Sequence, residues 1–443
     1  MFSIEISSVI FLITLFFSCA LFYKNFSKIL RNIKLGKDAG EFTNKESRWK
    51  NVLFIAFGQK KMFKKPLVAV LHLIVYLGFI IINIEIIEII LDGILGTHRI
   101  LYSPNWAGLY NFLINSFEVL ALLVLVSCII FLIRRNIIRI RRFHNKEMKG
   151  WPTSDANLIL IFEILLMSAF LIMNATDLAM GHVDNDWKGT GSDFLISGLL
   201  APFFHTMSFS SLYFLFKFSW WFHILGIFGF LNYLVISKHL HILLAFPNTY
   251  YASLKPKGQF NNMSSVTNEV KIMLDPNADP FSQPESNSNP DRFGAKDVTD
   301  LTWVQLLNAY SCTECGRCTS ECPANATGKK LSPRKIMMDV RDRTEELSKS
   351  LDKHGDNFSD GKTLLNDFIQ PEELWACTSC NACVEACPLN IDPLSIIIDL
   401  RRYLVMEESA APSELNSVFS NIENNGAPWQ FPASDRLKWK EDE

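Results

Sequence analysis

Eight of the ten cysteines lie in two copies of one spacing, between Cys312 and Cys387. Each copy holds three cysteines separated by two-residue gaps and, after a three-residue gap, a fourth cysteine followed by proline. In proteins with two cubane clusters, the three close cysteines wrap one [4Fe–4S] cluster and the fourth reaches the other. The predicted ligand sets are Cys312, Cys315, Cys318 and Cys387 for one cluster, and Cys377, Cys380, Cys383 and Cys322 for the other.

The same residues disfavour other uses of cysteine. Zinc sites employ pairs of cysteines rather than a repeated quartet. Regular clustering in a chain of 443 residues also points to metal rather than to disulfides. Cys19 and Cys128 lie in apolar stretches and are interpreted as small buried residues.

The repeat extends beyond the cysteines. Residues 332–341 parallel residues 392–401, and each segment begins with Ser or Asp followed by proline. A capping residue followed by proline at the first helical position is typical of a helix start. About 54 residues separate the two cysteine runs, more than in compact bacterial ferredoxins. These features predict a helical, extended ferredoxin domain.

Histidines within apolar stretches are the second chemical signal, because ligating residues inside a membrane are costly and usually functional. His223 and His241 are 18 residues apart in one apolar stretch. On a single helix they would share a face and stand about 27 Å apart. His72 is expected at the depth of His241, so these two predict the axial ligands of one haem b. Interfacial polar residues, hydrogen-bonded to a neighbouring helix, are the alternative.

A second haem at His223 lacks an obvious partner. The matching position holds Ile82 and Asn83, and only His205 offers a substitute. One haem b is therefore expected, and a second stays open. Glu163 is placed for proton movement at a quinone site or for a structural hydrogen bond. Glu85 and Glu88 are expected to reach the outer interface. No catalytic residue is predicted.

Five apolar stretches are long enough to cross a bilayer, which takes about 20 helical residues. They run near Ile6–Tyr23, Pro66–Ile90, Asn111–Ile133, Asn157–Met180 and Leu212–Leu244. Residues 194–208 are also apolar and are expected to be re-entrant or at the surface, or else a sixth span. The first stretch lacks a basic leading region and a cleavage site, so it is interpreted as a retained helix.

Lysine and arginine crowd two of the loops, residues 24–65 and 134–149. Basic loops stay on the cytoplasmic side. This predicts a multi-pass protein of the cytoplasmic (inner) membrane, with the N-terminus outside and the cluster domain in the cytoplasm. A net charge of −2 does not indicate a nucleic-acid partner.

The expected fold is all-α, a five-helix transmembrane bundle followed by a cytoplasmic α-helical ferredoxin domain. The predicted division is residues 1–250 for the transmembrane haem b domain, 251–299 for an extended linker, 300–408 for the two-cluster domain and 409–443 for a C-terminal tail. The linker assignment depends on a composition rich in Asn, Ser, Pro and Asp.

Two segments resemble known families. Residues 220–241 resemble the last helix of the nitrate reductase gamma subunit family, which includes the membrane subunits of heterodisulfide reductases and binds haem b. The runs Cys312-Thr-Glu-Cys-Gly-Arg-Cys318 and Gly328-Lys-Lys-Leu-Ser-Pro333 are similar to heterodisulfide-reductase-like Fe–S oxidoreductases. Together they resemble membrane-bound Fe–S oxidoreductases that pass electrons from electron-transfer flavoprotein to quinone.

The chain departs from this resemblance in two ways. The family's histidine pair on the second helix is represented by His72 alone, which argues for one haem. Family members often continue into a cysteine-rich CCG domain, whereas this sequence ends at Glu443. A separate CCG-domain Fe–S subunit is therefore expected as a partner.

These observations predict a membrane subunit of a quinone-linked oxidoreductase. Electrons would cross two [4Fe–4S] clusters and haem b between a cytoplasmic partner, such as electron-transfer flavoprotein, and a menaquinone-type carrier in the lipid. Two alternatives stay open, a membrane-anchored redox sensor or anchor subunit and a relay to a disulfide-reducing partner.

Overall fold

The computed structural model describes residues 6–184, 187, 194–277, 292–355 and 358–441. Five of its helices are long and apolar enough to cross a membrane. They are α1 (Ile6–Ile33), α3 (Pro66–Leu95), α4 (Ala107–Asn136), α5 (Trp151–Val183) and α7 (Phe209–Ile236). The predicted number of spans is confirmed.

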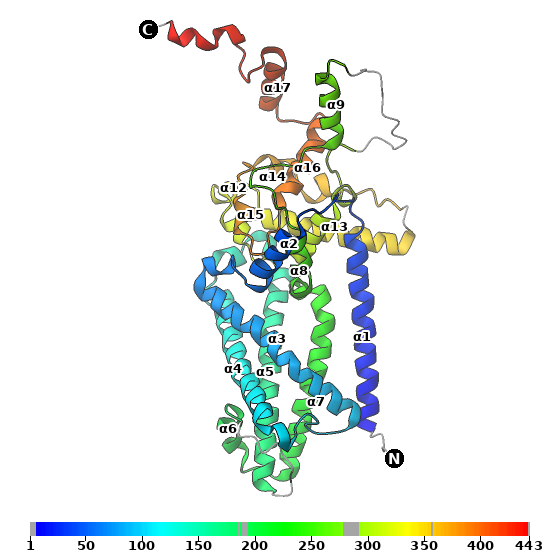
Figure 1. Ribbon diagram of the computed structural model, residues 1–443, viewed down its shortest axis with the longest axis vertical. Helices are drawn as coiled ribbons and strands as arrows, with labels where there is room; N and C mark the ends of the chain where they lie inside the picture. The colour runs from blue at the N-terminus through cyan, green and yellow to red at the C-terminus, as the bar shows by residue number, and fades with distance from the viewer. Residues whose placement is uncertain (1–5, 185–186, 188–193, 278–291, 356–357, 442–443) are drawn as a thin grey trace.

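The five long helices lie side by side below a second, irregular helical region (Figure 1). α5 packs between α4 and α7, α3 packs on α4, and α1 rests on α3 and α7. Buried apolar side chains such as Phe117, Phe170 and Phe216 fill the interior, whereas Phe16 and Phe214 on the outside are largely exposed. Apolar side chains that face outward on such helices suit a lipid environment.

The apolar segment before α7 does not form a sixth span. It folds into α6 (Ser197–Leu200) and a 3-10 turn (Ala201–Phe204) that rest on α5. These pieces are far shorter than the roughly 20 residues that a crossing needs. The alternative of six spanning helices is therefore wrong for the described residues.

The fifth apolar stretch is broken, which corrects the expected geometry of its histidines. α7 ends at Ile236, and Ser237 adopts an extended conformation with φ −112° and ψ 165°. The Ser237 hydroxyl accepts a hydrogen bond from the backbone N–H of His239, so it caps the turn Lys238–Leu240 that leads into α8 (His241–Tyr251). A capping serine competes with the helical backbone. His223 and His241 therefore lie on different helices, so the expectation that one helix carries both rings on a shared face was wrong.

The cluster region is built from short helices around two longer ones. They are α10 (Trp303–Ser311), α11 (Arg317–Ser320), α12 (Pro323–Ala326), α13 (Pro333–His354), α14 (Pro371–Trp375), α15 (Ala382–Ala386) and α16 (Pro393–Met406). The predicted helix starts are confirmed, because Ser332 and Asp392 cap α13 and α16 with proline at the first turn. The two repeats meet where α11 contacts α15 and α13 contacts α16.

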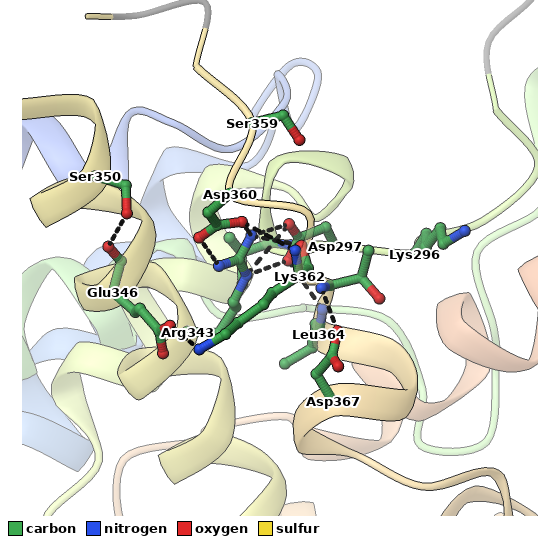
Figure 2. A network of polar contacts seen from close by, with 12 residues as sticks. Lys296, Asp297, Arg343, Glu346, Ser350, Ser359, Asp360, Lys362, Leu364 and Asp367 are labelled. Carbon is green, nitrogen blue, oxygen red and sulfur yellow. Dashed lines mark hydrogen bonds and ion pairs between the residues drawn. The ribbon is translucent and has the colours of Figure 1, made fainter. Parts of the chain in front are cut away.

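The long segment between the cysteine runs is anchored by one arginine (Figure 2). Arg343 of α13 has a side chain that is 1% exposed, and its guanidinium binds Asp297 and Asp360 at 2.7 and 2.6 Å. It also donates to the Lys362 carbonyl, while Asp297 accepts the N–H of Leu364. The hydrogen bond from Arg343 lowers the pKa of Asp360. These bonds fix the segment against the helical core.

Smaller elements join the bundle to the cluster region. α2 (Lys45–Asn51) and the π-helical turn Val52–Phe57 pack on α8, which contacts α10. The chain after α1 pairs with the segment before α10 through one isolated bridge, Lys37 to Thr302. Among the described residues there are no strands, which agrees with the predicted all-α fold.

The expected linker and tail are partly helical. α9 (Ser264–Leu274) lies in the linker, so the described part of that segment is not extended throughout, and residues 278–291 lie outside the described residues. α17 (Ser413–Asn425) and a 3-10 helix (Ala433–Lys440) follow α16 and project away from the bundle (Figure 1).

Candidate metal centres and membrane cavity

The second cysteine run shares a cavity with the last cysteine of the first run. Four cysteines line one partly open cavity, whose walls include Leu331 and Ile397: Cys322, Cys377, Cys380 and Cys383. This grouping matches the predicted crossing of the fourth cysteine between repeats. Four thiolates around an apolar cavity are the donor set that a cubane cluster requires.

The other four cysteines also gather across the repeats. Cys387 lies within electrostatic range of Cys312, Cys315 and Cys318. Its sulfur accepts the backbone N–H of Ile391 at 3.4 Å. Backbone donors to the sulfurs tune cluster potentials, so the loop supplies a part of the electronic environment as well as the ligands.

The two cysteine loops turn in the same way. Glu314 and Ser379, two residues after the first cysteine of each run, have φ of 54° and 55°. Gly316 and Asn381, directly after the second cysteine, have φ of 69° and 59°. Two left-handed residues on either side of the second cysteine curl the backbone. The N–H of Ser379 reaches the sulfur of Cys377 at 3.4 Å. The repeat is therefore a repeat of conformation as well as of spacing.

The cysteine groups do not form a site for a single ion. Among the described residues, no three His, Cys, Asp or Glu side chains converge closely enough to hold one metal ion. A tetrahedral zinc site would need sulfurs about 3.8 Å apart, because each Zn–S bond is about 2.3 Å long. A cubane cluster is a larger inorganic body than one ion, and the cysteines spread around the cavity of Cys322 and Cys377 suit it.

The first cysteine run sits against the loop that joins α4 to α5. Arg334 is fully buried and donates to the Arg142 carbonyl and to Glu147, both at 2.6 Å. Gly316 lies directly beneath the Arg334 guanidinium, where a Cβ atom would come within 2.4 Å of it. Glycine is therefore required at this turn for space as well as for its positive φ.

An ion pair joins the same run to the end of α7. Lys238 binds Glu314, which lies between Cys312 and Cys315, at 2.8 Å. Arg341 of α13 binds the other oxygen of Glu314 at 2.8 Å. Burial alone would raise the pKa of Glu314, but Arg341 and Lys238 hold it below its usual value. Lys238 is thus engaged in this contact, which places the first cysteine run next to the segment that carries His241.

Three histidines gather at this end of the bundle. His72 of α3 lies within electrostatic range of both His239 and His241, and the rings of His239 and His241 are 5.8 Å apart. Burial lowers the pKa of His239 and of His241, so both rings are neutral, the form that binds iron. The sequence analysis predicted His72 and His241 as ligands and assigned no ligand role to His239.

The hydrogen bonds of these rings leave one nitrogen available. Nδ1 of His72 bonds to Gln59 at 3.0 Å, and Nδ1 of His241 bonds to the Lys238 carbonyl at 2.9 Å. The structure describes no hydrogen bond to Nε2 of either ring. Iron-binding histidines are usually held in this way, with the second nitrogen donating to an oxygen. Nδ1 of His239 is buried without a partner among the described residues.

His223 lies apart from this group, beside a cavity between α3, α4, α5 and α7. Its Nδ1 bonds to the Leu166 carbonyl at 3.0 Å. Besides His223, polar residues Asn83, Glu85 and Glu163 line the cavity. His205 does not line it and instead stacks on His182 with ring centroids 4.2 Å apart. His205 is therefore not the missing partner of His223.

The sequence analysis did not predict the positions of several polar residues. Glu85 and Glu88 were expected at the outer interface but are each 3% exposed. Their position on α3, three residues apart with Asp92 following, is the signal that was available. The sequence contains no comparable signal for Gln59 and Glu314, because their roles depend on contacts with distant segments.

Comparisons with known proteins agree with the cysteine geometry. Residues 311–391 match the model of a 4Fe–4S dicluster domain. The chain is 26% identical to the "Probable iron-sulfur-binding oxidoreductase FadF" of Bacillus subtilis, over 98% of this chain and 61% of the relative. It is 27% identical to the "EtfAB:quinone oxidoreductase" of Syntrophomonas wolfei, over 87% of this chain and 52% of the relative.

A third relative is the "Probable membrane-anchored ferredoxin" of Chromohalobacter salexigens, 36% identical over 34% of this chain and 24% of the relative. The chain spans about half to three fifths of the length of the first two relatives. No solved structure matches it. Subunits of heterodisulfide reductases also match, which confirms the predicted resemblance. The chain is therefore a homologue of iron–sulfur oxidoreductases that carries a 4Fe–4S dicluster domain.

Proposed function

We propose that the chain relays electrons between a cytoplasmic redox partner and the quinone pool of the inner membrane. The relay runs through two [4Fe–4S] clusters and one haem b. The observation that carries the proposal is the Lys238–Glu314 contact at 2.8 Å, because it joins a cysteine loop to the segment that holds His239 and His241. Redox centres on adjoining segments are what an electron relay requires.

Each cluster is held by three cysteines of one run and the last cysteine of the other. Cys312, Cys315, Cys318 and Cys387 hold the cluster nearer the membrane bundle. Lys61, in the loop before α3, donates to the carbonyl of Val384 at 3.3 Å and so supports this position. Cys322, Cys377, Cys380 and Cys383 hold the second cluster. Cys380 is exposed, which suits exchange of electrons with a partner protein.

His72 of α3 and His241 of α8 are the proposed haem ligands. Gln59 and the Lys238 carbonyl orient the two rings and fix the tautomer that leaves Nε2 for iron. His239 is the alternative to His241, since it lies beside both rings. When bound, haem b supplies one-electron chemistry at this end of the bundle. His223 lies on another helix beside the cavity, so a second haem there would need a ligand other than His205.

The proposed orientation follows from the basic loops. Residues 24–65 and 134–149 lie at the end of the bundle that adjoins the cluster region (Figure 1). By the positive-inside rule this end is cytoplasmic and the N-terminus is outside. The partner is then a cytoplasmic protein, such as an electron-transfer flavoprotein or an Fe–S subunit with a CCG domain. The names of two relatives, an oxidoreductase of EtfAB and quinone and a membrane-anchored ferredoxin, support this choice.

A second candidate function is a relay to a disulfide-reducing partner. It is favoured by one observation, the match of 27% and 32% of this chain to two subunits of heterodisulfide reductases. In that case the clusters and the membrane bundle would still transfer electrons, but the partner protein would use them to reduce a disulfide.

Visible difference spectra of the anaerobically purified protein test the proposal. We expect iron and sulfide for two clusters, and a haem b band that dithionite reduces and a menaquinone analogue reoxidises. A protein with both clusters but no haem band would contradict the haem assignment and favour an anchor or sensor role. A haem band that the quinone analogue leaves reduced would contradict the link to quinone.

A further inference from the structure

Three acidic residues form a buried ladder on α3. Glu85, Glu88 and Asp92 are 3%, 3% and 8% exposed. Spaced at i, i+3 and i+7, they share one face and span about 10 Å along the helix axis. The ladder points toward Leu95, the end of α3 that lies away from the cluster region (Figure 1).

The ladder begins at the His223 cavity. Glu85 is one of the cavity-lining residues, and its Oε2 is buried without a hydrogen-bond partner among the described residues. Its Oε1 accepts a hydrogen bond from Arg99 at 2.9 Å. Glu163 of α5 and His223 of α7 face the same space. The cavity has an internal volume of about 70 Å³ and is open on one side.

The ladder ends at the loop after α3. Arg99 lies 3.7 Å from Glu88 and donates to Asn174 at 2.6 Å. Glu88 accepts from the Tyr110 hydroxyl at 2.8 Å, and Asp92 accepts the backbone N–H groups of Arg99 and Ile100. Most of the loop is exposed, so the last carboxylate adjoins water.

Acidic groups outnumber basic ones around this loop. The carboxylates are Glu85, Glu88 and Asp92 of α3 and Asp177 of α5. The oxygens of Glu118 on α4 already accept from Asn174, Ile196 and Ser197, so Glu118 stands outside the set that binds protons. The basic groups are Arg99, which is 8% exposed, His98, which lies 3.6 Å from Asp177, and Lys217 of α7 near His98. Buried carboxylates in such excess are costly as charges, so a cluster of this kind binds protons.

We propose that Glu85, Glu88 and Asp92 carry protons between the His223 cavity and the aqueous phase at the end opposite the cluster region. The proposal rests on the proposed function, and it assigns the cavity to the quinone ring. Quinone takes two electrons from the reduced clusters and two protons along the ladder, and two O–H bonds form to give quinol. The reverse reaction releases both protons by the same route. Transfer then separates charge, because electrons and protons arrive from opposite ends.

Arg99 acts as a positioning residue in this route. A guanidinium keeps its proton at all working pH values, so it does not pass protons itself. It donates to Glu85 and lies 3.7 Å from Glu88, so it keeps the two carboxylates close together. Glu163 and His223 complete the polar side of the cavity.

Proteoliposomes test the proposal with the full-length protein, menaquinone in the bilayer and a pH dye trapped in the lumen. Ti(III) citrate outside reduces only those molecules whose cluster region faces outward. We expect lumenal alkalinisation by about one proton per electron. Glu85→Gln should slow it about tenfold or more, as loss of a proton carrier does. The amide oxygen still accepts from Arg99, which keeps the fold.

Glu118→Gln is the matched control. Glu118 is fully buried on α4, but it accepts from Asn174 and from the N–H groups of Ile196 and Ser197, and it does not line the cavity. The Glu118→Gln variant should therefore alkalinise the lumen at the wild-type rate. Equal rates in Glu85→Gln and wild type, or protons taken up only from outside, would overturn the proton route. Absence of quinol formation by the wild-type protein would overturn the proposed function itself.

Discussion

The two histidine regions of the membrane bundle differ in what surrounds the imidazoles. At the cluster end, three histidines lie together on two helices and a turn: His72, His239 and His241. Glu314, which adjoins this segment, is paired with Lys238. At the cavity, His223 has no second histidine among the described lining residues and shares the space with Glu85 and Glu163. Two neutral imidazoles suit iron, whereas one imidazole with carboxylates suits a ligand that exchanges protons.

In the proposed relay, this difference would separate electron transfer from proton transfer along one bundle. The cluster end adjoins the cysteine loops and has the donor set for a redox metal. The cavity adjoins a carboxylate ladder that leads to the opposite end. A protein that couples the two must keep them apart, because protons that entered from the cluster end would cancel the charge separation.

The largest expected effect comes from removing one histidine from each of the two regions. His72→Ala should abolish haem b, since it removes an axial ligand, while His223→Ala should keep full haem content and slow quinone reoxidation by about tenfold or more. A pyridine haemochrome assay on both purified variants measures haem per protein. Loss of about half of the haem in His223→Ala would instead identify His223 as a ligand to a second haem.

The next effect concerns the ion pair between Lys238 and Glu314, which joins a cysteine loop to the segment that carries His241. Glu314→Gln removes the charge that Lys238 and Arg341 share, so the cysteine loop should shift relative to His241. We expect haem reduction after mixing with Ti(III) citrate to slow by about tenfold, with unchanged iron content. Removing one partner of a buried pair costs about 3–5 kcal/mol, which is enough to move a loop.

Lys330→Met is the control for that experiment, because Lys330 forms an exposed ion pair with Glu372 in the same region at 2.5 Å. Exposed pairs contribute about 0–1 kcal/mol, so this variant should reduce its haem at the wild-type rate. Equally slow haem reduction in both variants would show that the Glu314 contact is not specifically required for electron transfer to the haem.

The two equivalent turns of the cysteine repeats give a smaller effect. Gly316→Ala forces a Cβ atom against Arg334, whereas Asn381 already carries one in the same conformation. We expect Gly316→Ala to destabilise the protein by about 1–3 kcal/mol and Asn381→Ala by less than about 1 kcal/mol. Thermal bleaching of the cluster absorbance measures both. Equal midpoints would contradict the packing role of Gly316.

The smallest expected effect is at the break between α7 and α8. Ser237→Ala removes the cap on His239, which should cost about 1 kcal/mol. The haem should stay bound but with a shifted reduction potential, because the segment that carries His241 loosens. A redox titration of the haem band checks this, and an unchanged potential would indicate that Ser237 does not set the position of His241.

Much of the cluster region could be predicted from the sequence, because its information is local. Cysteine spacing and the Ser332-Pro333 and Asp392-Pro393 starts depend on neighbours along the chain, and both predictions of helix position were confirmed. The membrane spans followed from hydropathy alone. The limits of the four predicted domains stay a prediction.

The histidine geometry could not be predicted in the same way. Helical periodicity carried the expected geometry of His223 and His241 through Ser237, where the backbone is extended and α7 ends. The burial of Glu85 depends on Arg99 from the following loop, and the place of Glu314 depends on Lys238 from another region. Hydropathy and helical periodicity carry no information about such contacts between distant segments.

Rapid mixing of the reduced protein with a menaquinone analogue tests the central claim most directly, with the cluster and haem absorbances followed together. In the wild type, we expect both to become oxidised within the same reaction. In His72→Ala, the clusters should stay reduced, because the path from the cysteine loops to the quinone passes the haem ligands. Cluster oxidation at the wild-type rate in His72→Ala would contradict the account.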